Sequence, residues 1–197
     1  MSIGILGAGA FGTELARNLS ARGIPAVIAN SRGPASLAAL AEELAPHVRA
    51  VSFDEAARAD IVILAVTWVK LANALQGLPH WGSRIVVDAA NPDEVPSLKP
   101  VELNGRLSSE VVSDMLPGAR VVKAFIDIEA EIFNEPAPAG GRRVLFYSGN
   151  DAEAKRQVGD LMAQMGFYAV DLGSLAVGGS LAQFPGEPFP GINFVKF

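Results

Sequence analysis

The 197-residue chain contains no cysteine and only two histidines, His47 and His80. The absence of cysteine excludes disulfides, thiolate metal sites and a cysteine nucleophile, and it fits a cytoplasmic protein. Two histidines are also too few for a histidine-rich metal site. We therefore expect chemistry that needs neither a bound metal nor a nucleophilic thiol.

An excess of basic charge and a long apolar run are also missing. Sixteen Lys and Arg residues stand against 21 Asp and Glu, a formal net charge of −5, and half of the residues are hydrophobic. This balance offers no basic surface to nucleic acid or to an anionic membrane. The most apolar stretch, 61–69, is shorter than the roughly 18 residues of a membrane-spanning helix. The first apolar run predicts a strand rather than a signal peptide. We expect a globular protein with no nucleic-acid or membrane partner.

A glycine-rich turn follows the first apolar segment. Residues 2–6 predict a short buried strand, and Gly7-Ala8-Gly9-Ala10-Phe11-Gly12 comes directly after it. The first glycine of this spacing permits a tight turn, the second lets the backbone approach a pyrophosphate, and the third allows close packing of helix on strand. The helix expected from about Phe11 to Arg22 directs its amino terminus at that anion. We interpret the turn as a dinucleotide-binding site; the alternative is a purely structural glycine turn.

The end of the second predicted strand, 26–29, indicates which dinucleotide binds. NAD sites usually have an Asp or Glu here that accepts hydrogen bonds from the ribose hydroxyls. This chain instead has Asn30-Ser31-Arg32-Gly33-Pro34. No carboxylate repels a 2′-phosphate, and the planar guanidinium of Arg32 can pair with one. We predict NADP as the cofactor; the alternative is that Arg32 is an ordinary solvated loop residue.

Strands and helices alternate along most of the chain. Continuous apolar runs at 60–66, 84–88 and 121–126 predict strands buried on both faces of a parallel sheet. Further strands are expected at 48–52, 142–149 and 167–172, with helices at 35–44, 54–57, 68–75, 108–116 and 151–165. Ser108 or Ser109 is expected to cap the fourth of these helices. The fold class predicted is α/β, a Rossmann-type doubly wound, mostly parallel sheet, and we assign residues 1–172 to an NADP-binding domain.

Ligands of doubly wound sheets bind beyond the carboxyl ends of the strands. Two predicted ends, Val66-Thr67-Trp68 and Ala90-Asn91-Pro92, are therefore expected to line the nicotinamide pocket, and Ala65 is also assigned to the cofactor site. A plain turn is an equal alternative for Asn91-Pro92. For Trp68, half-buried packing is favoured over a role as a stacking platform. The end of the 121–126 strand also points at the site, and Lys123 within it is expected to contact a carboxylate or a sheet edge.

Residues 173–197 differ in composition from the rest of the chain, with five glycines, three prolines and four phenylalanines. The segment has too many breakers for a long helix. It also has too much aromatic surface to remain in water, since burial of one Phe stabilises by roughly 1.5–3 kcal/mol. We predict a C-terminal docking arm on its own body, near the site or across a partner subunit. A homodimer is the simplest way to cover it.

Six segments together resemble one family: GAGAFG at 7–12, NSRG at 30–33, DIVILAV at 60–66, DAANP at 88–92, LPGARVVKAF at 116–125 and SGNDA at 148–152. The chain is similar, over about 2–172, to predicted dinucleotide-binding oxidoreductases related to the NADPH-dependent deazaflavin-coenzyme reductases. Relatives of that family include the cytosolic domain of membrane metalloreductases. The resemblance implies hydride transfer between NADP(H) and a small-molecule electron acceptor, a flavin or 5-deazaflavin.

The resemblance also implies where the cofactor binds. It implies that the pyrophosphate is held by Gly7, Ala10, Phe11 and Gly12, the 2′-phosphate by Ser31 and Arg32, and the nicotinamide side by Val66, Asn91 and Pro92. The chain departs from the family at Thr67, where proline is expected, and at Phe125-Ile126-Asp127, where Phe-Asn-Thr is expected. Both departures lie on the acceptor face, so the acceptor is the least transferable part of the resemblance.

Hydride transfer between stacked rings depends on position, orientation and exclusion of water, and it needs no nucleophile. We assign no catalytic acid or base, because a structural role is the simpler explanation for Thr67, Asp88 and Asp127. Two other functions remain open. One is NADPH-dependent reduction of a small carbonyl or imine, for which the usual helical substrate domain is not seen after residue 172. The other is a non-catalytic dinucleotide-sensing module.

Overall fold

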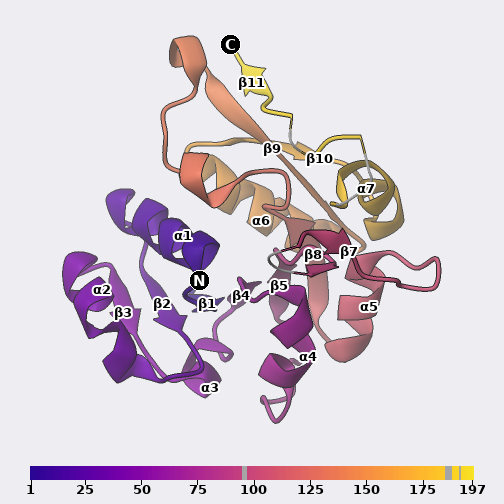
Figure 1. The fold of residues 1–197 in the computed structure, drawn as a ribbon. Coiled ribbons are helices and arrows are strands. Elements are labelled where there is room, and N and C mark those ends of the chain that lie inside the picture. Colours follow the sequence, from indigo (N-terminus) through magenta and orange to yellow (C-terminus); the bar gives the residue numbers. More distant parts are fainter. Residues whose placement is uncertain (95–96, 185–187, 191) are drawn as a thin grey trace.

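The computed structural model describes residues 1–94, 97–184, 188–190 and 192–197. A central twisted sheet runs between two layers of helices (Figure 1). In the described part of the chain its strands follow the order β10-β9-β8-β5-β4-β1-β2-β3, with β11 paired to β9. Their bounds are β1 Ile3–Leu6, β2 Ala26–Ala29, β3 Val48–Ala50, β4 Ile61–Leu64, β5 Ile85–Asp88, β8 Arg120–Ala124, β9 Arg142–Gly149, β10 Tyr168–Asp171 and β11 Val195–Lys196.

The sheet is mostly parallel. From β3 across to β8 every neighbouring pair is parallel, β9 is antiparallel to β8, and β10 is parallel to β9. The chain leaves β1 toward β2 and β3, then returns to the other side of β1 with β4 and β5. This reversal of strand order is the topological switch point of a Rossmann-type fold, so the predicted fold class is confirmed.

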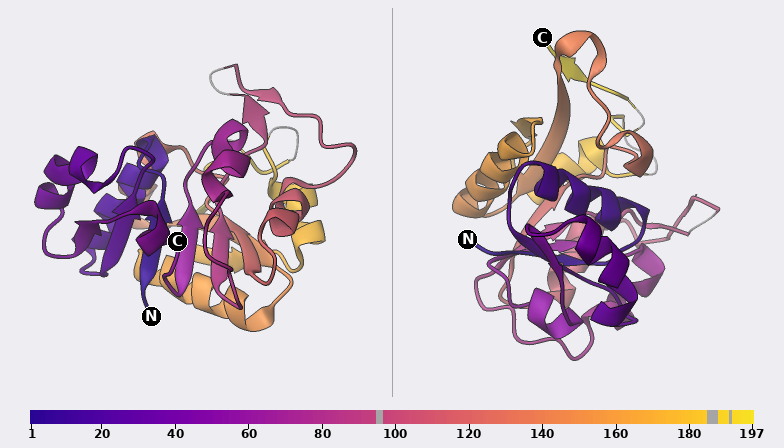
Figure 2. Two further views of the ribbon diagram at one scale, coloured as in Figure 1. Left: turned by 90° about the horizontal axis from the view of Figure 1, so that it is seen from below. Right: turned by 90° about the vertical axis from the view of Figure 1, so that its left-hand side faces the viewer.

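The helices cover both faces of the sheet, as the two side views also show (Figure 2). One face carries α1 Ala10–Ala21, α2 Ala38–Glu43 and α6 Ala152–Gln164; the other carries α3 Phe53–Ala56, α4 Trp68–Leu75, α5 Ser108–Met115 and α7 Leu175–Ala182. A small antiparallel hairpin consists of β6 Asp93–Glu94 and β7 Lys99–Pro100, and the 3-10 turns are η1 Pro34–Leu37, η2 Ala130–Ile132 and η3 Pro138–Gly140.

Alternation of side chains explains the continuous apolar runs. In β4, Ile61 and Ile63 belong to the core under α1 and α6, whereas Val62 and Leu64 belong to the core under α3, α4 and α5. All four side chains are fully buried. A strand with helices on both faces requires apolar residues at every position, which is why these runs identified the central strands from sequence.

Two local predictions are wrong. Neither Ser108 nor Ser109 caps α5, because the helix begins at Ser108 and its N-cap is Leu107, whose N–H donates to Glu110 Oε2 at 3.2 Å. Both serines are buried at 1% exposure. The strand expected at 121–126 ends earlier, at Ala124, because Phe125 adopts a positive φ of 63° and turns the chain away from β9.

The described residues of 173–197 lie on β9 of the same chain. Helix α7 packs against α5 and β9, and β11 runs antiparallel to the start of β9, with Val195 opposite Arg143. The Phe146 ring lies 4.7 Å from the Phe189 ring and 5.3 Å from the Phe194 ring, centroid to centroid. The division of the chain at residue 172 stays a prediction.

A buried ion pair joins the carboxyl ends of β5 and β8. Lys123 Nζ lies 2.9 Å from Asp88 Oδ2, with side-chain exposures of 3% and 0%, and the two residues are register partners. Lys123 Nζ also donates to the carbonyl oxygen of Ala90, and Asp88 Oδ1 accepts from the Ala90 N–H at 3.0 Å. The expected carboxylate contact of Lys123 is confirmed, and the pair fixes the chain that leaves β5.

Removing one partner of this pair should destabilise the fold. We expect Asp88→Asn to lower the free energy of unfolding by about 3–5 kcal/mol, because it leaves the Lys123 ammonium buried and unpaired. Urea unfolding measures the change. The double variant Asp88→Asn with Lys123→Met should lose less than the sum of the single variants. Asp54→Asn breaks an exposed pair with Arg58 and should change stability little; an equally small effect of Asp88→Asn would contradict the assignment.

Candidate functional site

Two glycines of the first turn are required by close backbone packing. Gly7 has a φ of +113°, and its N–H donates to the Ala29 carbonyl at 2.9 Å, which ties the turn to β2. A Cβ on Gly7 would lie 2.1 Å from the Ala65 carbonyl oxygen, and one on Gly12 would lie 2.1 Å from the Gly7 carbonyl oxygen. The ends of β1 and β4 and the start of α1 therefore meet at distances that only glycine allows.

Gly9 differs, because packing does not explain it. A Cβ at Gly9 would meet nothing within 4 Å, and the residue is exposed with φ −81° and ψ −167°. It is the N-cap of the twelve-residue α1, which has no side-chain cap and no acidic residue in its first turn. The first N–H groups of α1 thus face open space, the arrangement that binds phosphate at helix amino termini. Packing thus leaves room at Gly9, where the sequence predicts close approach of a pyrophosphate.

The loop after β2 is held by its own side chains. Asn30 Oδ1 accepts from the Arg32 N–H at 2.9 Å, and Asn30 Nδ2 donates to Ser36 Oγ at 3.0 Å. Ser36 Oγ in turn donates to the Gly33 carbonyl at 2.7 Å. Ser31 and Arg32 are exposed. Among the residues that the structure describes, Arg32 makes no ion pair. Asn30 therefore shapes the loop and leaves the Arg32 guanidinium available to a ligand.

The chain after β4 lies beside the glycine turn. The Ala65 N–H donates to the Leu6 carbonyl at 2.8 Å, and Ala65 and Val66 are half-buried. Thr67 is exposed at the N-cap of α4 and makes no capping hydrogen bond. Trp68 packs, half-buried, on the core of that face. The structure thus brings 65–67 next to the turn, and it gives Trp68 the packing role that was favoured from sequence.

One side-chain oxygen in the chain after β5 has no hydrogen-bond partner among the described residues. Asn91 Oδ1 is buried and has no hydrogen-bond partner in the described structure. Pro92 is buried, and its carbonyl accepts from the Val101 N–H at 2.8 Å. A plain turn offers no reason to bury an unpaired amide oxygen, because buried polar groups are nearly always hydrogen-bonded. Asn91 is therefore placed as a ligand-facing residue would be.

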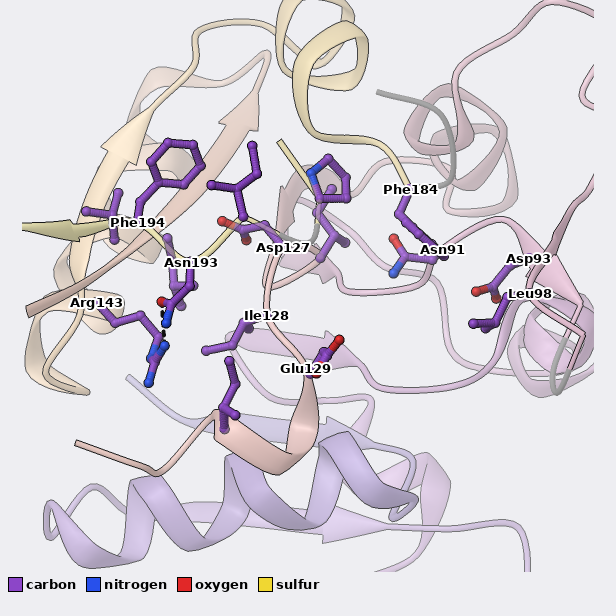
Figure 3. A pocket seen from close by; sticks show the side chains of 16 residues that line it. Asn91, Asp93, Leu98, Asp127, Ile128, Glu129, Arg143, Phe184, Asn193 and Phe194 are labelled. Atoms are coloured by element: carbon purple, nitrogen blue, oxygen red, sulfur yellow. Dashed lines mark hydrogen bonds between the residues drawn. The ribbon is translucent and has the colours of Figure 1, made fainter. Parts of the chain in front are cut away.

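A cavity of about 350 Å³ opens beyond the carboxyl ends of β5 and β8 (Figure 3). Asn91 reaches it from the chain after β5, Ile126 and Asp127 from the chain after β8, and Arg143 from the start of β9. The described residues of the arm, Phe194 among them, form a further wall. Sequence reasoning singled out Asn91 and the end of the 121–126 strand. It missed Arg143, because no local pattern shows that β9 continues beyond the end of β8.

Asp127 completes the sheet edge beside this cavity. Asp127 Oδ2 accepts from the Phe146 N–H of β9 at 3.2 Å. On the same edge of β9, the Val144 N–H donates to the Phe194 carbonyl at 2.9 Å. Asp127 Oδ1 is buried without a partner in the described residues. Burial raises the pKa of Asp127 to about 7. The carboxyl thus replaces part of a β8 strand that ended at Ala124.

The structure therefore gives different surroundings to Thr67, Asp88 and Asp127, the three residues considered for proton transfer. Asp88 is occupied by Lys123, and Thr67 is exposed to solvent. Only Asp127 combines a pKa near neutrality with an unpartnered oxygen in a cavity, which are the features of a proton-transfer group. In the described part of the chain, no group of three or more His, Asp or Glu residues is arranged to hold a metal ion. No described helix combines the length and apolar character that a bilayer crossing requires.

Comparison with known proteins places this geometry in context. Residues 2–92 match the family model described as NADP oxidoreductase, coenzyme F420-dependent. The crystal structure of a hypothetical protein from Sinorhizobium meliloti is 46% identical, with a TM-score of 0.94 over 100% of this chain and 97% of that one. A putative F420-dependent NADP-reductase from an Arthrobacter species is 28% identical, with a TM-score of 0.71 over 89% of this chain and 86% of that one.

Other relatives match this chain over only part of their own length. Metalloreductase STEAP3 of Rattus norvegicus is 32% identical over 176 residues, which are 88% of this chain and 34% of that protein. The chain spans about a third of the curated relatives that it matches. A reductive aminase from Aspergillus terreus, solved in complex with NADPH, has a TM-score of 0.67 at 21% identity, over 91% of this chain and 57% of that one. That likeness concerns the fold.

Substitutions at Gly9 and Gly12 should separate binding from folding. Gly9→Val should leave the melting temperature unchanged and weaken NADPH binding at least tenfold, or about 1.4 kcal/mol, because its side chain enters the open space before α1. Gly12→Ala should lower the melting temperature, because its Cβ meets backbone at 2.1 Å. Thermal unfolding and fluorescence titration with NADPH measure the two effects. Wild-type NADPH affinity in a folded Gly9→Val variant would show that no phosphate lies there.

Proposed function

The chain belongs to a family of NADP-dependent oxidoreductases, and from this premise we propose that it transfers hydride from NADPH to a flavin or 5-deazaflavin type acceptor. The observation that carries the proposal is the adjacency of two sites at one edge of the sheet. The open amino terminus of α1 lies beyond β1, and the cavity lies beyond β5 and β8. An acceptor in that cavity would lie beside the expected position of the nicotinamide.

The described residues fit NADP at three places. The open space before Gly9 suits the pyrophosphate, the exposed guanidinium of Arg32 suits the 2′-phosphate, and the unpaired oxygen of Asn91 suits a donor such as the nicotinamide amide. We propose that the pyrophosphate is bound by Gly7, Gly9, Ala10, Phe11 and Gly12. The 2′-phosphate is bound by Asn30, Ser31 and Arg32. The nicotinamide is bound by Ala65, Val66, Thr67, Asn91 and Pro92.

NADPH supplies the hydride, and the protein supplies position and exclusion of water. The glycine turn and α1 hold the phosphates and so fix one end of the nucleotide. The Lys123–Asp88 pair fixes the chain that presents Asn91. The described arm residues, with the Phe146, Phe189 and Phe194 rings in mutual contact, cover the cavity. These contacts orient two reactants without a covalent step on the protein.

One observation favours a second candidate function. Reduction of a small imine or carbonyl also consumes a proton, and Asp127 has a pKa near neutrality beside the cavity. The acceptor therefore decides between two reductase activities. A stopped-flow screen of NADPH oxidation with deazaflavin, FMN, FAD, quinones, ferric chelates and 1-pyrroline tests both. We expect fastest turnover with the deazaflavin or flavins; tight NADPH binding without turnover of any acceptor would favour the dinucleotide-sensing module instead.

We also propose that the protein forms a homodimer through the arm. Among the described residues of 173–197, three large apolar residues are exposed on the single chain: Val177 at 51%, Ile192 at 49% and Phe197 at 78%. Burial of such side chains in a twofold interface is favourable. Sedimentation equilibrium should give twice the 20.6 kDa of one chain. A mass of one chain at micromolar concentration would contradict the dimer.

Charge reversal at Arg32 tests the cofactor assignment. Arg32→Glu should weaken NADPH binding about 10- to 100-fold more than NADH binding, because it removes a charge-assisted hydrogen bond worth about 1.5–3 kcal/mol and adds repulsion. Isothermal titration with both nucleotides measures the difference. Arg106→Glu makes the same charge change in the exposed loop before α5 and should leave both affinities unchanged. Equal losses of NADPH and NADH binding in Arg32→Glu would mean that Arg32 does not read the 2′-phosphate.

A further inference from the structure

Several residues that line the cavity beneath the arm have a buried polar atom without a hydrogen-bond partner in the described structure. In the described residues five buried side-chain nitrogen or oxygen atoms lack a hydrogen-bond partner, and three of them belong to residues that line this cavity: Asn91 Oδ1, Asp127 Oδ1 and Arg143 Nε. Native proteins pair almost all such atoms. Three together, from three separate segments of the sheet edge, indicate a ligand that partners them.

Arg143 adds an uncompensated charge. The residue is buried, with 6% of its surface exposed. Its Nη1 donates to Asn193 Oδ1 and its Nη2 to the Glu135 carbonyl at 3.5 Å, both neutral acceptors. Within the described ranges no carboxylate forms an ion pair with it. Buried charges are normally paired, and a guanidinium suits phosphate or carboxylate. An anionic ligand would pair this charge.

Asp127 lies between this guanidinium and Asn91 in the close view (Figure 3). Three other charged side chains line the cavity around it: Asp93, Glu129 and Arg143. Asp93 is itself buried, and burial raises its pKa, whereas Glu129 is exposed. Asp127 Oδ2 is held by the Phe146 N–H, which leaves Oδ1 for a ligand. At neutral pH a substantial fraction of Asp127 carries a proton, since its pKa is about 7.

We propose that this cavity binds the hydride acceptor, that Arg143 binds an anionic group of the acceptor, and that Asp127 gives the acceptor its proton. The anionic group is a phosphate ester, as on a flavin mononucleotide, or a carboxylate, as on a cyclic imino acid. This inference rests on the proposed function. It adds the acceptor class and two residues of the chain beyond β8, Asp127 and Arg143.

The reaction balances with these groups. The acceptor gains the hydride of NADPH, with both its electrons, at one atom, and the proton of Asp127 at a nitrogen. NADPH is oxidised to NADP⁺, and the acceptor is reduced by two electrons. The Asp127 O–H bond breaks as the new N–H bond forms, and the carboxylate regains a proton from water. Since only protonated Asp127 donates, kcat should fall as the pH rises through about 7.

Matched acceptors test the anion site. FMN is compared with riboflavin, and 1-pyrroline-5-carboxylate with 1-pyrroline, in equilibrium binding and in NADPH oxidation. The pair whose anionic member binds more tightly identifies phosphate or carboxylate. Arg143→Gln should lower that preference about tenfold or more, with an unchanged Kd for NADPH. Arg142→Gln is the matched control, because the neighbouring guanidinium is exposed over the Tyr168 ring and should leave the preference unchanged.

Asp127→Asn tests the proton. The amide oxygen can still accept from the Phe146 N–H, so the variant should fold with the wild-type melting temperature. We expect kcat to fall about 100-fold and to lose its dependence on pH near 7, with little change in KM. Glu129→Gln, at the exposed rim of the cavity, should keep the wild-type pH profile.

The measurements distinguish a failure of the proposed hydride transfer from a failure of the anion site or of the proton transfer. If no acceptor is turned over but the Arg143-dependent binding preference persists, the hydride-transfer function fails and the anion site stands. An unchanged preference in Arg143→Gln, or no measurable binding of either anionic probe to the wild type, would overturn the anion site. An unaltered pH profile in Asp127→Asn would overturn the proton transfer.

Discussion

The structure depends on the close approach of three backbone segments at the end of β1. Side chains at Gly7 or Gly12 would overlap with carbonyl groups of Ala65 or of the turn itself, so α1 can start directly above the sheet and β4 can end beside it. The resulting position of α1 exposes its first N–H groups at the switch point of the strand order. Loss of this contact would move the amino terminus of α1, the proposed phosphate-binding end, away from the carboxyl ends of β4 and β5.

A second constraint acts on the other side of the switch point. The Lys123 ammonium holds Asp88 and the Ala90 carbonyl together, so the ends of β5 and β8 cannot separate without leaving a charge buried. Beyond this pair, the positive φ of Phe125 ends β8 and exposes part of the β9 edge. The Asp127 carboxylate takes one of the open N–H groups, and the chain before β11 takes the other. The cavity lies where β8 no longer covers β9, beside an edge that is completed by the Asp127 carboxyl and the Phe194 carbonyl.

Much of this arrangement could be predicted from sequence, because its signals are local. The glycine spacing and the apolar run of β4 specify their structures within a few residues, and Trp68–Leu75 was predicted with the bounds that α4 has. Three features could not be predicted. The hydrogen bond from the Leu107 N–H to Glu110 lies at the start of α5, but in the sequence Glu110 is only an acidic residue after two serines. The pairing of Val195 with Arg143 joins positions 52 residues apart without a turn signal. The unpaired atoms of Asn91, Asp127 and Arg143 become visible only when three segments converge.

The residues that line the cavity come from separate segments of the chain. The family model ends at residue 92, so it contains the glycine turn, the Arg32 loop and Asn91, whereas Asp127, Arg143 and Phe194 all lie beyond it. In the proposed function, residues within that range hold the electron donor, whereas Asp127 and Arg143, which are proposed to meet the acceptor, lie outside it. On this proposal, exchanging residues 126–145 and 192–195 between relatives would change the electron acceptor and leave the electron donor the same.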